Sequence, residues 1–497
     1  MSIASSRGRA LVVGSGFGGL AVALRLRALG HEVVVLERLD QPGGRARTFC
    51  RGGYRFDAGP TVITAPFLFD ELFDLFDRRL DDYVELVSVE PWYRFEFADG
   101  TRLDYGADLQ ETLAGIERFE PADRQGYLRL LEASERIFRV GFEQLADQPF
   151  DHPLSMLRQL PNLIRLGSHR SVWQFTRRYL RDDRLRRAFS IQPLLVGGNP
   201  FDTTCIYSLI HYLERRWGVH FAMGGTGALV AALTRLLTEQ GGELRLNAEV
   251  ARIDVQGGRA AGVTLTSGES LPADLVVFNG DPAYAYGNLL EQAPKRRWTP
   301  RRLGRFDYSM GLYVLYFGTN RRYPDVRHHT IVFGNGYREL LDQIFTGGEL
   351  SEDLSLYLHR PTATDPSLAP AGHDAFYVLA PVPNLKYLGD WDEHRETLRR
   401  HVLEILERRL LPDLSQHIDM AFDMTPQEFH RDYRSTWGAG FSIAPLFRQS
   451  AYFRFHNRSE EVEDLYFVGA GTHPGAGVPG VLSSAKVVEN LLQSAGA

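Results

Sequence analysis

The chain has 497 residues, of which 44% are hydrophobic and 24% charged, so it is long enough for two or three domains and has the composition of a soluble globular protein. Its formal net charge of −6 argues against a general nucleic-acid-binding protein. Its two cysteines, Cys50 and Cys205, exclude a disulfide framework, and no C-x-x-C motif or Cys/His cluster in the sequence predicts a metal site.

Residues 10–37 predict a strand, a glycine-rich turn, a helix and a second strand. Gly14, Gly16 and Gly19 have G-x-G-x-x-G spacing, which lets the backbone approach a pyrophosphate at the N-terminus of the helix. Glu37 follows the second strand, about 20 residues after the turn, where a carboxylate accepts hydrogen bonds from a ribose. The segment therefore predicts dinucleotide binding.

Two further turns favour a flavin over a nicotinamide cofactor. Gly43 and Gly44 permit a second close approach to phosphate, and Arg45 can neutralise its charge. Many flavoprotein oxidoreductases carry this second glycine pair, and a nicotinamide-binding fold does not need it. Residues 53–61 then predict a strand that enters a rigid turn at Pro60. This turn either passes beside an isoalloxazine ring or is a plain β-turn.

The next part of the chain predicts helices and one hairpin. Apolar residues at helical spacing predict a core helix over 67–76, and an amphipathic pattern predicts a long helix over 123–145. Residues 92–97 predict the first strand of a hairpin.

Residues 151–190 differ in charge from the rest of the chain. They hold nine arginines against three aspartates, a local charge of +6, with apolar residues such as Ile164 and Trp173 between them. Basic side chains between apolar anchors are typical of a helix that lies on anionic lipid. The alternative is a solvated helical face whose arginine stems cover the core.

Residues 223–242 predict a helix between glycine-rich ends, and residues 243–278 predict several strands. We expect these elements to return to the nucleotide-binding sheet, which makes the first domain discontinuous. Residues 305–444 predict antiparallel strands rich in aromatic residues, over 310–317, 353–359 and 375–381.

The C-terminal segment predicts a second strand, glycine loop and helix over 464–492. Five glycines fall within the twelve residues 469–480, so the backbone there is bare. The N-terminus of the predicted helix could meet the anionic end of a reduced flavin through its N–H groups.

With both ends in view, the chain resembles the bacterial-type phytoene desaturases, the carotenoid desaturases of the FAD-dependent amine-oxidase-like superfamily. The resemblance covers essentially the whole chain. It rests on GSGFGG at 14–19, PGGRA at 42–46, FDAGPTVIT at 56–64, LLVGGNPF at 194–201, GGTGALV at 224–230, VLAPVP at 378–383 and VGAGTHPGAGVPG at 468–480.

The resemblance implies a mixed α/β fold with a Rossmann-like FAD-binding domain of glycine-pair flavoprotein topology. This domain is expected to be discontinuous, over residues 1–80, 221–290 and 455–497. Residues 81–220 would form a helical region in contact with the substrate and the membrane. Residues 291–454 would form a substrate domain with an antiparallel sheet, and a helical lid is expected.

The same resemblance implies FAD as cofactor. The residues implied to contact it are Gly14, Ser15, Gly16, Phe17, Gly18, Gly19, Glu37, Arg38, Gly44, Arg45, Pro60, Thr61, Val250, Asp281, Gly471, Thr472, Gly480 and Val481. The sequence departs from the family at Gly280, where Ala is more usual.

The implied activity is stepwise desaturation of phytoene and partly desaturated carotenoids, towards neurosporene or lycopene, with hydride transfer to FAD. His473 and Asp57 are candidate proton acceptors, but loop hydrogen bonding is the more usual role for a residue such as His473 and backbone capping for one such as Asp57, and the reaction need not use a dedicated base. The expected electron acceptor is oxygen or quinone. The expected location is the cytoplasm, with peripheral attachment to the inner membrane through residues 151–190, since no run of about 18 apolar residues predicts a membrane span.

Three other functions stay open. The enzyme could desaturate or isomerise another carotenoid intermediate, or it could oxidise an amine or a porphyrinogen. Cys50 and Cys205 both lie far from the C-terminal motif, where amine oxidases usually attach flavin. A non-catalytic carrier of prenyl lipids on the same fold is a remote alternative, because such carriers have eroded flavin sites.

Overall fold

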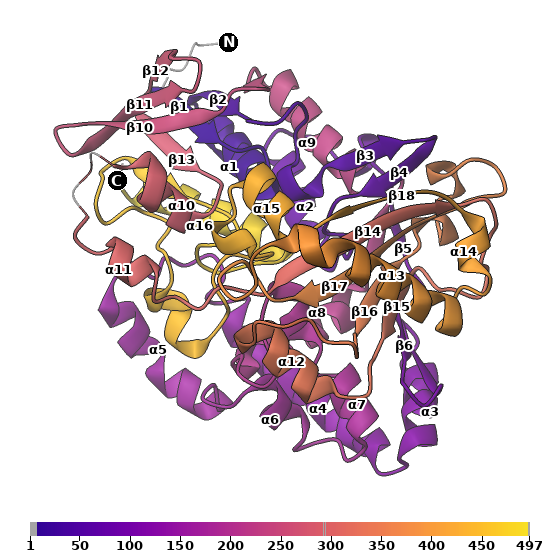
Figure 1. The fold of residues 1–497 in the computed structure, drawn as a ribbon. Coiled ribbons are helices and arrows are strands. Elements are labelled where there is room, and N and C mark those ends of the chain that lie inside the picture. The colour runs from indigo at the N-terminus through magenta and orange to yellow at the C-terminus, as the bar shows by residue number, and fades with distance from the viewer. Residues whose placement is uncertain (1–6, 292, 294, 496–497) are drawn as a thin grey trace.

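The computed structural model describes residues 7–291, 293 and 295–495 (Figure 1). The outer ends of the predicted first and last domain segments, residues 1–6 and 496–497, lie outside this part of the chain. No described helix is both long and apolar enough to cross a membrane.

A five-stranded sheet carries the predicted nucleotide-binding elements. Its strand order is β19-β13-β1-β2-β9, and every neighbouring pair is parallel. The strands are β1 (Arg9–Val13), β2 (Glu32–Leu36), β9 (Glu243–Arg245), β13 (Leu275–Phe278) and β19 (Leu465–Phe467). Segments far apart in the sequence therefore form one sheet, and the Rossmann-like fold is confirmed.

Three helices pack together beside this sheet. They are α1 (Phe17–Ala28), α9 (Thr226–Glu239) and α16 (Val478–Ala495). Helix α1 lies between the other two, and Figure 1 shows α1 in indigo close to α16 in yellow. Their apolar side chains form one core cluster with those of β1 and β2. Because β1 and β19 run in the same direction, the glycine loops that follow them lie at the same end of the sheet.

The strands after β9 differ from the prediction that the elements of residues 243–278 return to the nucleotide-binding sheet. β10 (Val250–Gln256), β11 (Arg259–Leu265) and β12 (Ser270–Pro272) form a separate antiparallel sheet, and only β9 and β13 of this region join the parallel sheet. The turn at Gly257 and Gly258 folds β10 back on β11. This pairing satisfies the backbone groups locally and leaves β10–β12 outside the main sheet.

A seven-stranded sheet forms the second layer, with strand order β18-β14-β17-β16-β15-β6-β7. The strands are β6 (Tyr93–Glu96), β7 (Arg102–Tyr105), β14 (Gly311–Thr319), β15 (His329–Val332), β16 (Leu356–His359), β17 (Asp374–Val382) and β18 (Ile418–Met424). The sheet is not wholly antiparallel, because β6 and β15 pair in parallel. The hairpin predicted in the helical region thus completes the substrate sheet.

A group of helices packs on one face of this sheet. They include α3 (Leu109–Phe119), α4 (Asp123–Gly141), α5 (Pro153–Leu166), α6 (Val172–Thr176), α7 (Asp183–Ala188) and α8 (Leu209–Trp217). Helix α4 ends at Gly141, four residues before the predicted end, where the glycine packs against Leu209 of α8. Helix α2 (Phe67–Asp74) lies close to its predicted range, and helix α13 (Trp391–Arg409) packs against the opposite face of the seven-stranded sheet.

Candidate active site

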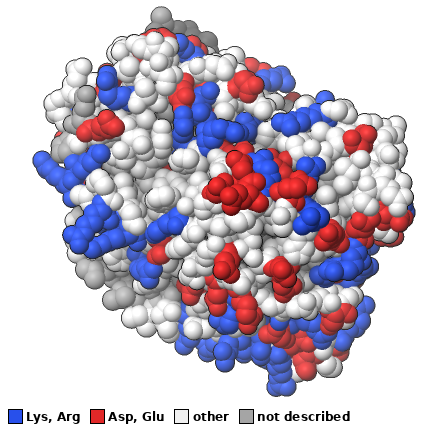
Figure 2. Space-filling view, in the orientation of Figure 1, with Lys and Arg blue, Asp and Glu red and all other residues white. Residues whose placement is uncertain are grey.

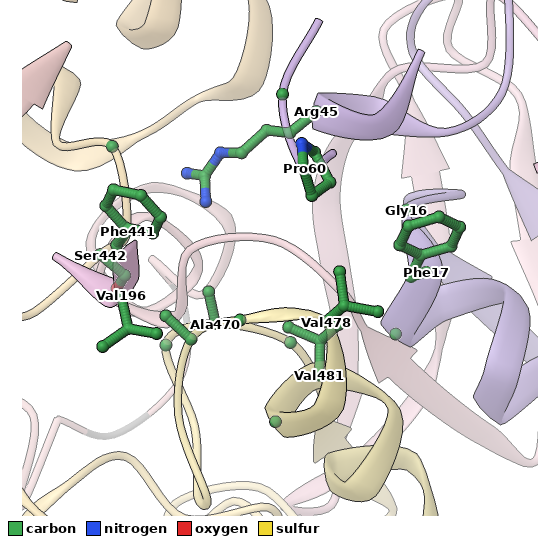
Figure 3. A pocket seen from close by; sticks show the side chains of 18 of the residues that line it. Gly16, Phe17, Arg45, Pro60, Val196, Phe441, Ser442, Ala470, Val478 and Val481 are labelled. Atoms are coloured by element: carbon green, nitrogen blue, oxygen red, sulfur yellow. The ribbon is translucent and has the colours of Figure 1, made fainter. Parts of the chain in front are cut away.

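One cavity of about 620 Å³ extends from the glycine loops of the parallel sheet to the apolar face of the seven-stranded sheet. Residues from both ends of the chain line it, including Gly16 of the first loop and Val478 of the last (Figure 3). The expectation that the two glycine loops meet at one site is therefore confirmed by their positions.

The first loop leaves the N-terminus of α1 open to this cavity. Gly14 has a φ of +96°, and a Cβ on Gly19 would lie 2.0 Å from the carbonyl oxygen of Gly14. Helix α1 starts after Gly16 with no side-chain cap and no acidic residue in its first turn. Its unpaired N–H groups and positive dipole end therefore remain available to an anionic group.

Glu37 is buried at the carboxyl end of β2, next to the loop. Its Oε2 accepts hydrogen bonds from the backbone N–H of Ser15 (2.9 Å) and from the Ser15 hydroxyl (2.7 Å), and its Oε1 accepts one from the N–H of Leu39 (3.0 Å). These donors fix the carboxylate at the cavity wall. The remaining lone pairs can accept hydrogen bonds from a ribose.

Arg45 brings a half-buried positive charge to the cavity. Its side chain extends between Pro60 and the segment that carries Phe441 and Ser442 (Figure 3). It donates to the Ser435 hydroxyl (3.3 Å), and within the described residues no carboxylate lies at ion-pair distance from it. Burial lowers the pKa of its guanidinium, and the field of Asp281 opposes that shift. A half-buried guanidinium at the cavity wall, with no carboxylate partner among the described residues, can neutralise a phosphate of a dinucleotide.

The C-terminal loop supplies the opposite wall of the same cavity. Helix α16 begins at Val478, and Val478 and Val481 lie close to Phe17 of α1 in the close view (Figure 3). A Cβ on Gly480 would lie 2.5 Å from the carbonyl oxygen of Gly475, so only glycine fits this close approach. The bare loop and the start of α16 can face the ring system of a dinucleotide cofactor.

Most of the sequence-predicted site residues line this cavity. They are Gly14, Ser15, Gly16, Phe17, Gly18, Glu37, Arg38, Gly44, Arg45, Pro60, Thr61, Val250, Asp281, Gly471, His473, Gly480 and Val481. Gly19, Thr472 and Asp57 are absent from the lining. Gly19 instead allows α1 to pack on Gly14, and the Thr472 hydroxyl donates to the carbonyl of Gly469 (3.0 Å).

The two candidate proton acceptors have different surroundings. Asp57 faces the start of α9, where it accepts the N–H of Thr226 (2.8 Å), and burial raises its pKa to about 7. His473 lines the cavity with its ring against Phe150, and its Nε2 lies 3.1 Å from the carbonyl of Leu145. Burial lowers the pKa of His473 to about 4, so its imidazole is neutral and a weak base.

Beyond the glycine loops, the cavity is lined mainly by aliphatic and aromatic side chains. They come from the helical layer and from the seven-stranded sheet, and they include Leu194, Ile210, Leu213, Leu312, Val314 and Phe333. A long apolar molecule would be held here away from water.

Glu214 of α8 is a carboxylate in this apolar part that the sequence interpretation missed. It is 1% exposed and lines the cavity, its Oε1 accepts the hydroxyl of Tyr93 (3.0 Å), and its buried Oε2 has no hydrogen-bond partner among the described residues. Burial raises the pKa of Glu214 to about 8, against the opposing effects of Tyr93 and Arg215. Helical spacing gives the signal, because Glu214 falls four residues after Ile210 on the apolar face of α8.

Comparisons with known proteins agree with this geometry. Residues 17–488 match the model of the flavin-containing amine oxidoreductase family. The chain is 47% identical to a lycopene-forming phytoene desaturase of Pseudescherichia vulneris, over 97% of this chain and 99% of that protein. It is 44% identical to a neurosporene-forming phytoene desaturase of Rhodobacter capsulatus, over 98% and 94%. Among solved structures, an oxidoreductase from Methanosarcina mazei shares the fold, with a TM-score of 0.66 and 18% identity over 97% of this chain and all of that one.

Proposed function

Because the chain belongs to the phytoene desaturase family of flavin-containing amine oxidoreductases, we propose that it is an FAD-dependent oxidoreductase that introduces double bonds stepwise into phytoene. The observation that carries this proposal is one continuous cavity that joins two bare glycine loops to an apolar chamber. The loops suit a dinucleotide, and the chamber suits a linear hydrocarbon.

Each desaturation removes a hydride and a proton from adjacent carbons of the substrate and leaves a new C=C bond. When bound, FAD supplies the hydride acceptor. The chain supplies the rest: Glu37, Arg45 and the start of α1 hold the cofactor, and the apolar wall orients the polyene and excludes water.

For the proton, we propose Glu214 as the acceptor. Its unpartnered Oε2 lies in the apolar wall, whereas Asp57 points to α9 and His473 is a weak base. A carboxylate with a pKa near the working pH accepts a proton efficiently. Tyr93 orients this carboxylate through its hydroxyl.

The test is anaerobic incubation of the purified flavoprotein with phytoene in liposomes, with absorption spectra recorded over time. The proposal predicts bleaching of the oxidised flavin together with longer-wavelength carotenoid bands. Isomerisation without net oxidation would change the carotenoid spectrum while the flavin stays oxidised. Readmission of oxygen, or addition of a quinone, then tests which of the two proposed acceptors restores the flavin.

We also propose that the protein binds a membrane surface around α5 rather than through all of residues 151–190. Leu154 and Ile164 of α5 are exposed, as are Phe447 and Phe453, and α5 packs against the turn Ala451–Phe453. Phe447 also lines the cavity, so the cavity reaches the surface beside this apolar group. A hydrocarbon substrate could enter here directly from lipid.

The basic charge that supports this attachment comes from another segment. Residues 295–305 hold six basic residues and no acidic one, and Arg297 donates to the carbonyl of Tyr452 in the turn next to α5 (3.2 Å). Figure 2 shows basic side chains along the left edge of the molecule, where Figure 1 places α11 (Pro300–Leu303). Arg184 and Arg187 of the 151–190 segment pair with Asp182 and Asp183, and Arg297 pairs with Glu460, whereas no ion pair of Arg301, Arg302 or Arg305 occurs among the described residues.

Co-sedimentation with anionic vesicles tests this attachment. The triple variant Arg301→Glu, Arg302→Glu, Arg305→Glu is expected to lose most binding, and so is the double variant Ile164→Ser, Phe453→Ser. The matched charge control is Arg177→Glu, Arg178→Glu, Arg181→Glu, which should bind nearly as well as the wild type. Equal binding of all variants would contradict the proposed surface.

A further inference from the structure

Three buried histidines, which are not among the site residues described above, lie close together beside the cavity. His328 and His329 stand at the start of β15, and His359 ends β16 directly opposite His329 in the antiparallel pair. Their exposed fractions are 4%, 0% and 0%. One ring nitrogen from each lies within 4.8 Å of one from each of the other two, and Nε2 of His328 is 3.0 Å from Nε2 of His359.

The other ring nitrogens of two of these histidines are held from outside the cluster. Nδ1 of His328 lies 2.6 Å from the Thr364 hydroxyl, and Nδ1 of His329 lies 2.7 Å from the Tyr357 hydroxyl. Nε2 of His329 and Nδ1 of His359 have no hydrogen-bond partner within the described part of the chain. Histidines that bind metals typically show this pattern, with one nitrogen oriented by a polar neighbour and the other left for the ion.

The electrostatic surroundings favour neutral imidazoles with available lone pairs. Burial lowers the pKa of all three histidines, that of His329 to about 3. The nearby guanidinium of Arg360 lies 3.3 Å from the buried carboxylate of Asp374, which offsets its charge. The ring of Phe221 packs edge-on against His328 and closes the cluster from one side. The unpartnered, buried Nε2 of His329 is costly in such a place unless a ligand occupies it.

We propose that His328, His329 and His359 form a binding site for one Zn²⁺ or a similar borderline divalent cation. Imidazole is a preferred ligand of such ions, and three imidazoles with one water complete a tetrahedral shell. Zn–N bonds of about 2.0–2.1 Å place tetrahedral nitrogens roughly 3.3 Å apart, which is close to the 3.0 Å between His328 and His359. His329 then supplies the third ligand nitrogen, which lies within 4.8 Å of one ring nitrogen from each of the other two histidines.

This site would also fix part of the cavity wall. The Tyr357 hydroxyl that contacts His329 lies 2.9 Å from the Thr61 hydroxyl, and both residues line the cavity. An ion on Nε2 of His329 fixes which ring nitrogen carries the proton, so Nδ1 becomes the donor to Tyr357. The ion is therefore a positioning element for this wall and does not itself touch the substrate.

The first test is the metal content of the untagged flavoprotein, purified from cells grown with added zinc and then dialysed. Elemental analysis should find close to one zinc per chain. The variant His329→Asn should lose this metal, because asparagine keeps a polar group near Tyr357 but has no counterpart of Nε2. His328→Asn serves as a second variant for the case that the first does not fold, which far-UV circular dichroism and flavin content reveal.

His211→Asn is the matched control, since His211 is another buried histidine, with Nδ1 3.3 Å from the Tyr105 hydroxyl and no part in the cluster. It should keep the metal. Zinc should also raise the Tm of the wild type and of this control but not of His329→Asn. Wild-type protein without stoichiometric metal, or folded His329→Asn and His328→Asn with as much metal as the wild type, would overturn the proposal. Neither result depends on turnover of phytoene.

Discussion

The variant Glu214→Gln keeps the size of a buried side chain and removes its charge. Glutamine retains a carbonyl oxygen that can accept the Tyr93 hydroxyl, which lies 3.0 Å from Oε1 in the wild type. The apolar wall around α8 should therefore keep its packing, and the change removes little beyond the ability to bind a proton.

The expected loss of activity follows from the position and the pKa of this carboxyl group. Burial raises its pKa to about 8, so only about one molecule in ten is ionised at pH 7. The rate of flavin reduction by phytoene should rise about tenfold for each pH unit below 8 and level off above it. Loss of a general base typically lowers a rate by about 10²- to 10⁴-fold, and the variant should show such a loss together with a flat pH profile in this range.

Stability provides a second measurement that does not depend on substrate. The folded state raises the pKa of Glu214 from 4.5 to about 8, so folding favours the protonated form. Its contribution to stability is complete below pH 4.5 and is lost as the pH rises through 8, by up to about 1.4 kcal/mol for each pH unit between these values. Glu214→Gln should therefore gain stability relative to the wild type as the pH rises from 5 to 9.

Stopped-flow measurement of anaerobic flavin bleaching gives the pH profile, and urea unfolding at several pH values gives the stability. Tyr93→Phe is the companion variant. It removes the hydrogen bond that stabilises the ionised carboxylate, so the rising part of its rate profile should move to higher pH. If Glu214→Gln reduces its flavin at the wild-type rate with an unchanged pH profile, the proposed proton acceptor is wrong.

Three further variants test the cofactor site. Glu37→Ala should retain much less FAD. It should also lose about 1–3 kcal/mol of stability, because the N–H groups of Ser15 and Leu39 lose their acceptor. An undiminished ratio of flavin to protein absorbance would contradict the ribose contact. Gly19→Ala should abolish FAD binding or folding, since its Cβ would lie 2.0 Å from the Gly14 carbonyl oxygen. The control Gly287→Ala adds its Cβ to open space, so its flavin content and Tm should equal those of the wild type. Arg45→Gln should weaken FAD binding by roughly 10- to 150-fold, from the 1.5–3 kcal/mol typical of charged hydrogen bonds, and fluorescence titration of the apoprotein would show the change.

Local sequence was sufficient to predict the two glycine loops and the strands and helices that flank them. Residues 10–37 predicted β1, α1 and β2 almost residue by residue, because a tight turn that needs small residues leaves a local signature in the chain. The C-terminal glycine loop before α16 was predictable for the same reason. In both segments, the residues that specify the backbone conformation are also those that line the cavity.

The contacts between residues that are far apart in the sequence could not be predicted from local patterns. Pairing of β15 with β16 brings His359 to His328 and His329, across 30 residues of sequence, and packing of α8 over the substrate sheet buries Glu214 in the cavity wall. Likewise, the turn at Tyr452 links the basic residues 295–305 to α5. Strand register and helix packing depend on the whole core, and no local pattern records them. Burial then sets the charge state of these groups, because the cost of desolvation depends on what surrounds a side chain rather than on its neighbours in sequence.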